Sequence, residues 1–327
     1  MSETFLTIKN LVVHYELETE VVEAVNNVSL SMQRGETLGI VGETGAGKTS
    51  LALSIMQLIP DPPGKIIQGA IELDGEDLTK LNKRQLHDIR GKKISMIFQD
   101  PMTSLNPVQT VGKQIMEVIK LHENCSAAEA TIRATEMLEM VGIPGERFNE
   151  YPHQFSGGMR QRVVIAIALA CNPELLIADE PTTALDVTIQ AQILEMMRKL
   201  KEDFNTSMIM ITHDLGVVAE TCDKVAIMYA GEIVEYGSAA HIFRNPQHPY
   251  TQGLFNSLPS LDKDVERLQP IPGLMPDPSK LPNICSFNVR CSQCGEQCKK
   301  GEPPVAEIEP GHFVRCCLVT QESGVKR

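Results

Sequence analysis

The stretch Gly42-Glu43-Thr44-Gly45-Ala46-Gly47-Lys48-Thr49 has the pattern G-x-x-x-x-G-K-T, and it decides how the rest of the chain is interpreted. It directly follows an apolar run at residues 37–41 and directly precedes a helix-like run at residues 50–58. A strand, a glycine-rich turn and a helix in this order can surround an anion with backbone N–H groups and the positive end of the helix dipole. Lys48 can reach the outer phosphates, and the Thr49 hydroxyl can hold Mg²⁺. The sequence therefore predicts that the chain binds a nucleoside triphosphate, with a chance glycine-rich turn as the alternative.

Length, charge and hydropathy limit the classes of protein to which the chain can belong. Its 327 residues suffice for one large domain or two smaller ones, and 42% of them are hydrophobic. A formal net charge of −12 argues against broad nucleic-acid binding, which depends on basic surfaces. No run reaches the roughly 18 apolar residues of a membrane helix, and the N-terminus lacks a secretory core. We therefore expect a cytosolic protein whose membrane role would require a separate membrane partner.

The distribution of apolar residues predicts an α/β fold. Residues 5–41 alternate short apolar runs with turns, which favours an antiparallel, β-rich start. Between about residues 110 and 150, apolar residues recur at helical spacing. Apolar runs without alternation, typical of strands buried in a parallel sheet, follow at residues 175–178, 208–211 and 225–228. These patterns predict a mainly parallel sheet core, an antiparallel β subdomain, and a helical subdomain at about residues 100–160.

The C-terminal part of the chain differs in composition. Prolines and turn residues dominate from about residue 245, and a domain boundary is expected near residue 260. The tail at residues 261–327 is too short and too rich in loops to bury a convincing core alone. Six of the nine cysteines fall within residues 285–317, and in a reducing compartment such a group favours a metal site over disulfides. We therefore expect the cysteines to staple the tail.

Two acidic residues end the first of the buried apolar runs. Asp179 can hold Mg²⁺ through its water shell, and Glu180 can act as general base towards the attacking water. Alone, the pair could equally cap a strand, but the phosphate loop favours the catalytic interpretation. His213 follows the next run and can contact the γ-phosphate or orient water, although a structural or surface role is the alternative. Gln99 can reach the metal and the attacking water, or it can be a surface residue.

A second candidate anion site lies in the stretch Phe155-Ser156-Gly157-Gly158-Met159-Arg160-Gln161-Arg162. A helix is predicted to begin here, and its exposed N–H groups and the Ser156 hydroxyl can hold an anion. One chain does not need two phosphate sites for one nucleotide. Two chains that face each other head to tail do need them, because each then supplies a site for the γ-phosphate bound to the other.

This ordered set of motifs resembles the ATPase subunit of an ABC transporter, a P-loop NTPase, over about residues 5–260. Residues 42–49 match the Walker A loop, residues 175–180 the Walker B strand and Gln99 the Q-loop. The signature is matched at residues 156–161, with Phe155 where leucine is usual. The remaining matches are the D-loop at Ala184-Leu185-Asp186, the switch histidine at His213 and the adenine-stacking aromatic at Tyr15, for which an ordinary strand aromatic is the alternative.

The resemblance implies a role for each matched residue. Glu180, His213 and Gln99 would take part in catalysis, and Thr49, Gln99 and Asp179 would bind Mg²⁺. The residues implied to contact ATP are Tyr15, Gly42, Glu43, Thr44, Gly45, Ala46, Gly47, Lys48, Thr49, Ser50, Ser156, Gly157, Gly158, Met159, Gln161 and Asp186.

Three stretches are similar to a narrower group, the oligopeptide/dipeptide (peptide/nickel) importers: residues 99–107, 179–188 and 245–251. The resemblance implies a nucleotide-driven ATPase dimer that closes on two ATP and pulls on two membrane permease subunits, at the cytoplasmic face of the membrane. It further implies uptake of di- or oligopeptides delivered by an external solute-binding protein. A sister chain is the expected second ATPase, with a second copy as the alternative. Nickel or another small solute is the alternative cargo.

The tail cysteines follow the spacing Cys285-x5-Cys291-x2-Cys294-x3-Cys298, with Cys316-Cys317 later. Four thiolates suit tetrahedral zinc and an iron–sulfur cluster equally well. The tail of the peptide importers is similar to C-x5-C-x6-C followed by one further cysteine, which maps onto Cys285, Cys291, Cys298 and Cys316 and implies a structural [4Fe-4S] cluster. Zinc, unmetallated thiols, and a ligand set that includes Cys294 or Cys317 remain open.

Two other classes of ATP-binding protein fit the sequence less well. A soluble ABC ATPase acting on ribosomes typically carries two ATPase units in one chain, and one acting on DNA repair intermediates carries a long coiled coil. This sequence has neither feature. A thiol or iron–sulfur regulatory protein that only binds ATP would not need Glu180 or the complete signature.

Overall fold

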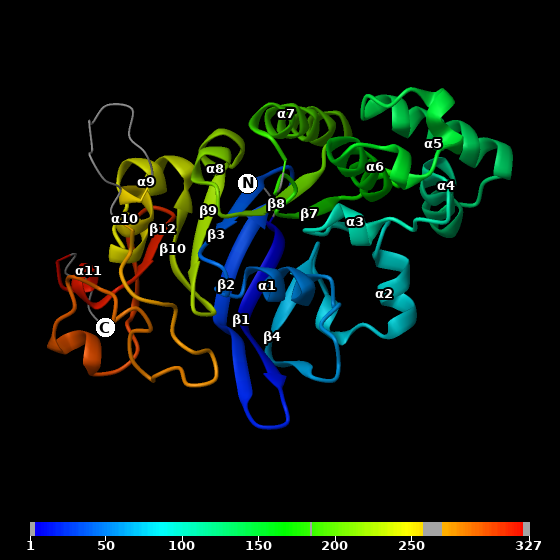
Figure 1. Ribbon diagram of the computed structural model, residues 1–327. Helices are drawn as coiled ribbons and strands as arrows, with labels where there is room; N and C mark the ends of the chain where they lie inside the picture. Colours follow the sequence, from blue (N-terminus) through cyan, green and yellow to red (C-terminus); the bar gives the residue numbers. More distant parts are fainter. Residues whose placement is uncertain (1–3, 184, 258–269, 323–327) are drawn as a thin grey trace. The chain divides into compact units, whose positions relative to one another are not determined.

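The computed structural model describes residues 4–183, 185–257 and 270–322 (Figure 1). These residues form two compact units. The first unit contains residues 33–37 and 80–211, and the second contains residues 4–32, 38–79 and the described residues from 212 onward. The domain boundary expected near residue 260 lies outside the described residues, so that division stays a prediction.

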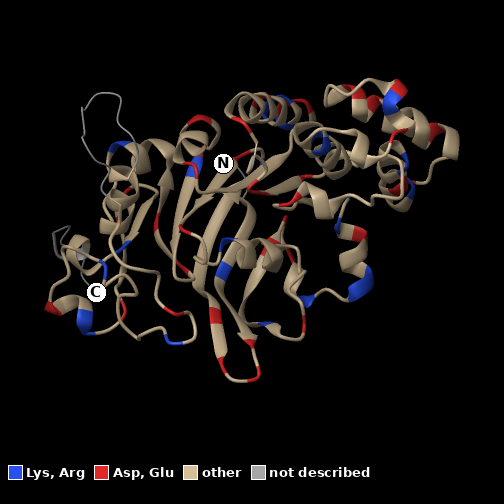
Figure 2. Cartoon of the chain, viewed as in Figure 1, with Lys and Arg blue, Asp and Glu red and all other residues tan. Residues whose placement is uncertain are grey.

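The second unit begins with an antiparallel sheet in the order β2-β1-β4-β5. Its strands are β1 (Thr4–Glu16), β2 (Val21–Gln33), β4 (Gly64–Leu73) and β5 (Glu76–Asp77). Apolar side chains of β1 and β2, such as Leu11 and Leu30, are buried, which explains the β-rich pattern seen in the sequence. The ribbon near the β1–β2 turn carries several segments coloured for acidic residues in Figure 2. Glu16 of β1 pairs with Lys65 of the neighbouring β4 at 2.7 Å.

The second sheet segment of this unit contains the strand that leads into the phosphate loop. β3 (Thr37–Val41) is buried throughout and runs parallel to β9 (Lys224–Tyr229). β9 pairs antiparallel with β10 (Glu232–Ser238), which pairs in turn with β12 (His312–Arg315). β11 (Val305–Glu309) completes this run by pairing with β12.

The tail contains two strands that the sequence analysis did not predict. Two of its strands extend the sheet of the second unit, and the side chains of Phe287, Ala306 and Val314 are buried. The strands are only four and five residues long, so their alternation is too brief to stand out from the surrounding turns.

The helices of the second unit are short. They are α1 (Lys48–Ile55), α8 (Leu215–Thr221), α9 (Ala239–Arg244), α10 (Pro249–Asn256) and α11 (Cys317–Glu322), with 3₁₀ turns at Leu78–Lys80 and Glu296–Lys299. Side-chain caps fix several starts. His248, for example, accepts a hydrogen bond from the Tyr250 N–H at the start of α10.

The first unit combines parallel strands with helices. β6 (Ile94–Ile97), β7 (Leu175–Asp179) and β8 (Ser207–Thr212) lie in the order β8-β7-β6, and both pairings are parallel. The helices are α2 (Lys83–Ile89), α3 (Pro101–Ser104), α4 (Val111–His122), α5 (Ala127–Met140), α6 (Gly157–Leu169) and α7 (Val187–Phe204), with 3₁₀ turns at Gly145–Asn149 and Pro152–Gln154.

The predicted architecture is confirmed in its main parts. The buried runs at residues 175–178, 208–211 and 225–228 lie in parallel-paired strands, the N-terminal region is antiparallel, and helices fill most of residues 101–169. Over the residues that the structure describes, none of the helices is both long enough and apolar enough to span a membrane.

Candidate functional site

The phosphate loop of residues 42–47 connects β3 to α1, as the sequence predicts. Two of its glycines are required by close backbone approaches. A Cβ atom on Gly42 would lie 2.2 Å from the Met228 carbonyl oxygen, and one on Gly47 would lie 2.2 Å from that of Ala24. Gly47 also has a φ of 99°, in the region that favours glycine. The tight turn therefore depends on the absence of side chains at these two positions.

Lys48 is held inside this loop. Its Nζ donates hydrogen bonds to the carbonyl oxygens of Gly42 at 2.8 Å and Glu43 at 3.0 Å, and the residue is 7% exposed. Thr44, Gly45 and Thr49 are exposed. The buried ammonium and the N-terminal turn of α1 are the groups that would meet a phosphate at the loop.

Tyr15 lies beside the same helix. Its hydroxyl donates to Ser50 Oγ at 3.3 Å, so the structure brings this residue together with the start of α1. The ring is half-buried. Its role in stacking on a base stays a prediction.

Glu43 has additional contacts that the sequence did not reveal. Its N–H donates to the Tyr250 hydroxyl at 3.0 Å, and its carboxylate accepts two hydrogen bonds from Arg290, at 2.6 and 3.0 Å. Arg290 lies 247 positions away in the tail. No local sequence pattern signals a contact between residues so far apart in the chain.

The acidic pair is located at the end of β7 in the first unit. Asp179 is buried and is the last residue of the strand, whereas Glu180 turns away with a φ of 49°. The Glu180 N–H donates to the Ile211 carbonyl at 2.9 Å, and its Oε2 accepts from Gln99 Nε2 at 3.0 Å and from Thr183 Oγ1 at 2.9 Å. The structure thus brings Gln99 and Glu180 together and fixes the carboxylate with neutral donors.

The signature stretch forms a capped helix start, as predicted. Ser156 is the N-cap of α6, and its Oγ accepts from the Met159 N–H at 3.4 Å. A Cβ atom on Gly158 would approach Ile189 Cγ2 to 2.6 Å, so the next helix, α7, leaves room only for glycine there. Gly157 is exposed. The first turn of α6 is therefore open to a ligand.

Other predicted site residues lie outside these groupings. Gln161 is 2% exposed, and its Nε2 has no hydrogen-bond partner among the described residues. Asp186 caps α7 by accepting from the Ile189 N–H at 3.0 Å. His213 is exposed directly after β8, and Ala184 of the predicted D-loop is outside the described residues.

The tail cysteines lie close enough to influence one another. Burial raises the pKa of Cys285 to about 12, and the nearby Cys298, Cys316 and Cys291 contribute to the increase. Burial likewise raises the pKa of Cys291 and Cys316. However, across the described parts of the chain, no three His, Cys, Asp or Glu side chains are arranged to hold a metal ion. The donor chemistry suits a metal, but the arrangement does not match one.

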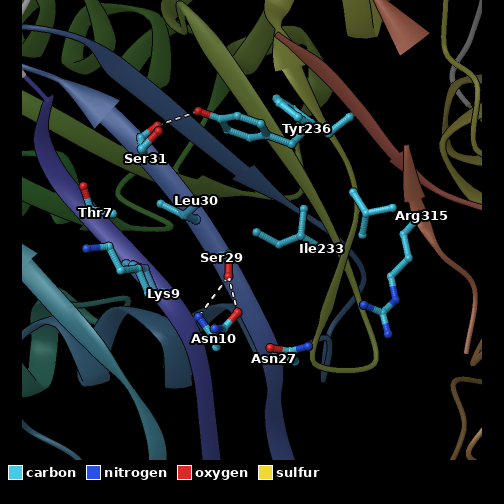
Figure 3. Close-up of a pocket in the computed structure, with 13 residues that line it drawn as sticks. Thr7, Lys9, Asn10, Asn27, Ser29, Leu30, Ser31, Ile233, Tyr236 and Arg315 are labelled. Atoms are coloured by element: carbon cyan, nitrogen blue, oxygen red, sulfur yellow. Dashed lines mark hydrogen bonds between the residues drawn. The ribbon is translucent and has the colours of Figure 1, made fainter. Parts of the chain in front are cut away.

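A cavity of about 530 Å³ lies in the second unit (Figure 3). Its walls come from β1, β2, β10, β11 and β12, and none of the predicted site residues lines it. Three hydrogen bonds connect residues of the walls: Tyr236 Oη donates to the Ser31 carbonyl at 2.5 Å, the Asn10 N–H donates to Ser29 Oγ at 2.9 Å, and Ser29 Oγ donates to Asn10 Oδ1 at 3.1 Å.

Comparison with known proteins identifies the class to which this fold and site belong. Residues 25–183 match the family model for ABC transporters, and residues 234–298 match that for the oligopeptide/dipeptide transporter C-terminal region. A solved dimeric structure of the ATP-binding cassette MJ0796, bound to ADP and Pi, is 30% identical with a TM-score of 0.65, and the match covers 72% of this chain and 98% of that one. Because this chain covers 98% of that cassette at 30% identity, the chain is identified as an ABC ATPase.

Relatives with similar sequences show which group of ABC ATPases the chain belongs to. The oligopeptide transport ATP-binding protein AppD of Bacillus subtilis is 49% identical, and the match covers 98% of each chain. The OppD protein of Escherichia coli is 49% identical over 98% of this chain and 95% of its own, and the dipeptide transport protein DppD of Escherichia coli is 46% identical over 98% of each. The chain belongs to the family of ATP-binding proteins of oligopeptide and dipeptide ABC transporters. ATP hydrolysis is general to this family, for which ATP and Mg²⁺ are expected.

Proposed function

We propose that this chain is the ATP-hydrolysing motor of an importer that takes up di- or oligopeptides. The observation that carries the proposal is the near-complete coverage of relatives named for oligopeptide and dipeptide transport, at 46–49% identity. The match to the C-terminal region model of the same transporters supports it independently of the ATPase core. Nickel or another small solute is the competing cargo.

The proposed chemistry assigns the groups of the two units to ATP hydrolysis. Lys48 and the loop N–H groups bind the phosphates, Tyr15 stacks on the adenine, and Thr49, Gln99 and Asp179 hold the Mg²⁺ shell. Glu180 accepts the proton of the attacking water, and His213 orients the γ-phosphate region. The hydrogen bonds from Gln99 and Thr183 to Glu180 support the base assignment. Both donors are neutral, so they orient the carboxylate without neutralising its charge, and the carboxylate has further lone pairs that can accept a proton from water.

The proposed assembly contains two ATPase units that face head to tail and close on two ATP. Ser156, Gly157, Gly158, Met159, Gln161 and Asp186 then face the nucleotide held by the other unit. The capped helix start at residues 156–159 supports this arrangement. It offers N–H groups to an anion, and it is a second such site in addition to the phosphate loop at residues 42–49. A sister chain supplies the second unit, two permease subunits respond to closure at the cytoplasmic face of the membrane, and an external solute-binding protein delivers the cargo.

Uptake measurements test this function. Cells that lack the chain are supplied with either the wild-type protein or Glu180→Gln, and entry of radiolabelled di- and oligopeptides and of Ni²⁺ is followed. We expect the wild-type protein alone to restore peptide entry. Restoration of Ni²⁺ entry without peptide entry would assign the competing cargo, and restoration of neither would contradict the importer function.

We also propose that Cys285, Cys291, Cys298 and Cys316 take up a [4Fe-4S] cluster with a structural role, with zinc as the alternative. The cysteine spacing and the mutual effect of these thiols on their pKa values support the proposal. The described arrangement does not converge on a metal, so binding would require the thiols to move together and lose their protons. Iron and zinc are measured in anaerobically purified wild-type protein, Cys291→Ser and the control Cys125→Ser. Absence of both metals from the wild-type protein contradicts the proposal.

A further inference from the structure

Among the described residues of the tail, Arg290 has a guanidinium that is buried among several partners. Arg290 directly precedes Cys291, and its side chain is 5% exposed. Two of its nitrogens donate to the Glu43 carboxylate, at 2.6 and 3.0 Å, and its Nε donates to the Pro272 carbonyl at 3.0 Å. The guanidinium carbon also lies 5.7 Å from the centroid of the Tyr229 ring. A buried charge of this kind is stable only while its partners stay in place.

The partner carboxylate belongs to the phosphate loop. The carbonyl of the same residue, Glu43, accepts a hydrogen bond from Lys48 Nζ at 3.0 Å, and its N–H donates to the Tyr250 hydroxyl at 3.0 Å. Glu43 therefore links the lysine of the loop to two side chains from the C-terminal half of the chain, Tyr250 and Arg290. A shift of Glu43 would move the carbonyl that holds the Lys48 ammonium.

The tail segment that carries Arg290 is compact and firmly packed. The N–H groups of Arg290 and Cys291 both donate to the Phe287 carbonyl at 3.0 Å. The Phe287 ring meets those of Tyr229 and Tyr250 at centroid distances of 5.2 and 5.4 Å. The turn between Cys285 and Cys291 thus packs against Tyr250, whose hydroxyl also accepts the hydrogen bond from Glu43 of the phosphate loop.

We propose that Arg290 is a positioning residue for nucleotide binding: it holds the phosphate loop through Glu43, and the Cys285–Cys291 turn thereby sets the affinity for ATP. Because a bidentate arginine–carboxylate pair fixes orientation as well as distance, lysine is not an equivalent replacement. The inference rests on the proposed role of the loop as the nucleotide site. It extends that role to a part of the chain that lies more than 240 residues further along the sequence.

Arg315 provides a matched control. It too directly precedes a tail cysteine, and its side chain is 9% exposed and pairs with Glu232 at 2.8 Å. It lines the cavity of Figure 3, and none of its described partners belongs to the phosphate loop. Loss of either arginine removes a buried ion pair from the tail, but only loss of Arg290 releases Glu43.

The test measures binding of the fluorescent nucleotide MANT-ATP to the full-length chain. Arg290→Gln, Arg290→Lys, Glu43→Gln, the double variant Arg290→Gln/Glu43→Gln and Arg315→Gln are compared with the wild-type protein below their unfolding temperatures. We expect Arg290→Gln and Glu43→Gln each to raise Kd about tenfold or more, the range of a typical coupling between sites. The Kd of the double variant should not exceed the larger of the two single-variant Kd values, because both changes break the same contact between Arg290 and Glu43. Arg290→Lys should fall between wild type and Arg290→Gln.

Arg315→Gln should lower the unfolding temperature and leave Kd unchanged. Equal Kd values for wild type, Arg290→Gln and Arg290→Lys would overturn the inference, as would an equal loss of affinity in Arg315→Gln. If Arg290→Gln does not fold, Arg290→Lys and Glu43→Gln still decide the outcome. Lys48→Ala is measured in the same experiment. Unchanged affinity for MANT-ATP in Lys48→Ala would contradict the assignment of the loop as the nucleotide site. Reduced affinity in Lys48→Ala, together with unchanged affinity in the Arg290 variants, would contradict only the positioning role of Arg290.

Discussion

Gln99 and Glu180 are joined by a hydrogen bond in which Gln99 Nε2 donates to Glu180 Oε2 at 3.0 Å. The two residues follow β6 and β7, which are parallel neighbours, so their strands end at the same edge of the sheet. The carboxylate proposed to act as general base is therefore oriented by the residue proposed to reach the metal. A displacement of the Gln99 side chain should therefore change the orientation of the Glu180 carboxylate.

Gln99→Ala should lower ATP turnover by roughly tenfold to a hundredfold, because the carboxylate loses one of its orienting donors. The Kd for MANT-ATP should stay close to that of the wild type, since the phosphate loop is unchanged. Steady-state phosphate release and nucleotide binding, measured on the same preparation, separate the two effects. An unchanged turnover number would show that the hydrogen bond has no part in catalysis.

Glu180→Gln should reduce turnover by about 10²–10⁴-fold while nucleotide binding is retained, because the amide cannot accept a proton from water. Glu174→Gln serves as a control, since Glu174 precedes the same strand and pairs with Arg34 at 2.7 Å, away from Gln99. Phosphate release by both variants is the measurement. Turnover of Glu180→Gln at the wild-type rate would remove this residue from the base role.

Lys48→Ala should weaken nucleotide binding by roughly tenfold to a hundredfold, the loss expected for one hydrogen bond from a charged group. The buried ammonium now rests on two loop carbonyls, and in the variant these oxygens lose their donor. Affinity for MANT-ATP is measured beside the unfolding temperature. Retained affinity in a folded variant would count against the phosphate-loop assignment.

His248 should make stability depend on pH. Burial lowers the pKa of His248 in the folded chain to about 4, whereas its pKa in the unfolded chain is near 6.5. Between these two pH values the imidazole is protonated in the unfolded chain but neutral in the folded chain. Stability is then complete above about pH 6.5 and falls as pH drops towards 4, by about 2 kcal/mol between pH 7 and pH 5. Urea unfolding across this range measures the slope.

His248→Asn is the matched variant for that measurement. Asparagine keeps an acceptor for the Tyr250 N–H, which His248 Nδ1 accepts at 3.0 Å, but it does not titrate. The buried Glu235 carboxylate, which accepts from the His248 N–H at 2.9 Å, is present in both proteins. We expect a lower stability at neutral pH and a shallower slope below it. Equal slopes would assign the pH dependence to other groups.

The parts of this molecule that could be predicted from the sequence are those with local causes. The phosphate loop is defined by eight consecutive residues, and the Ser156 cap by the turn and helix that follow it. Buried strands such as β7 are visible as unbroken apolar runs. The contact of Arg290 with Glu43 and the pairing of β12 with β10 join distant segments, and no local periodicity encodes them.

The most direct test of the transport assignment is capture of the assembly from membranes. Tagged Glu180→Gln is purified gently in the presence of ATP, with ADP as the control, and the associated chains are identified by mass spectrometry. We predict that two permease subunits and a second ATPase subunit accompany the chain with ATP, because blocked hydrolysis keeps the ATPase dimer closed. Recovery of ribosomes, of DNA or of the chain alone would contradict its role as the motor of an importer.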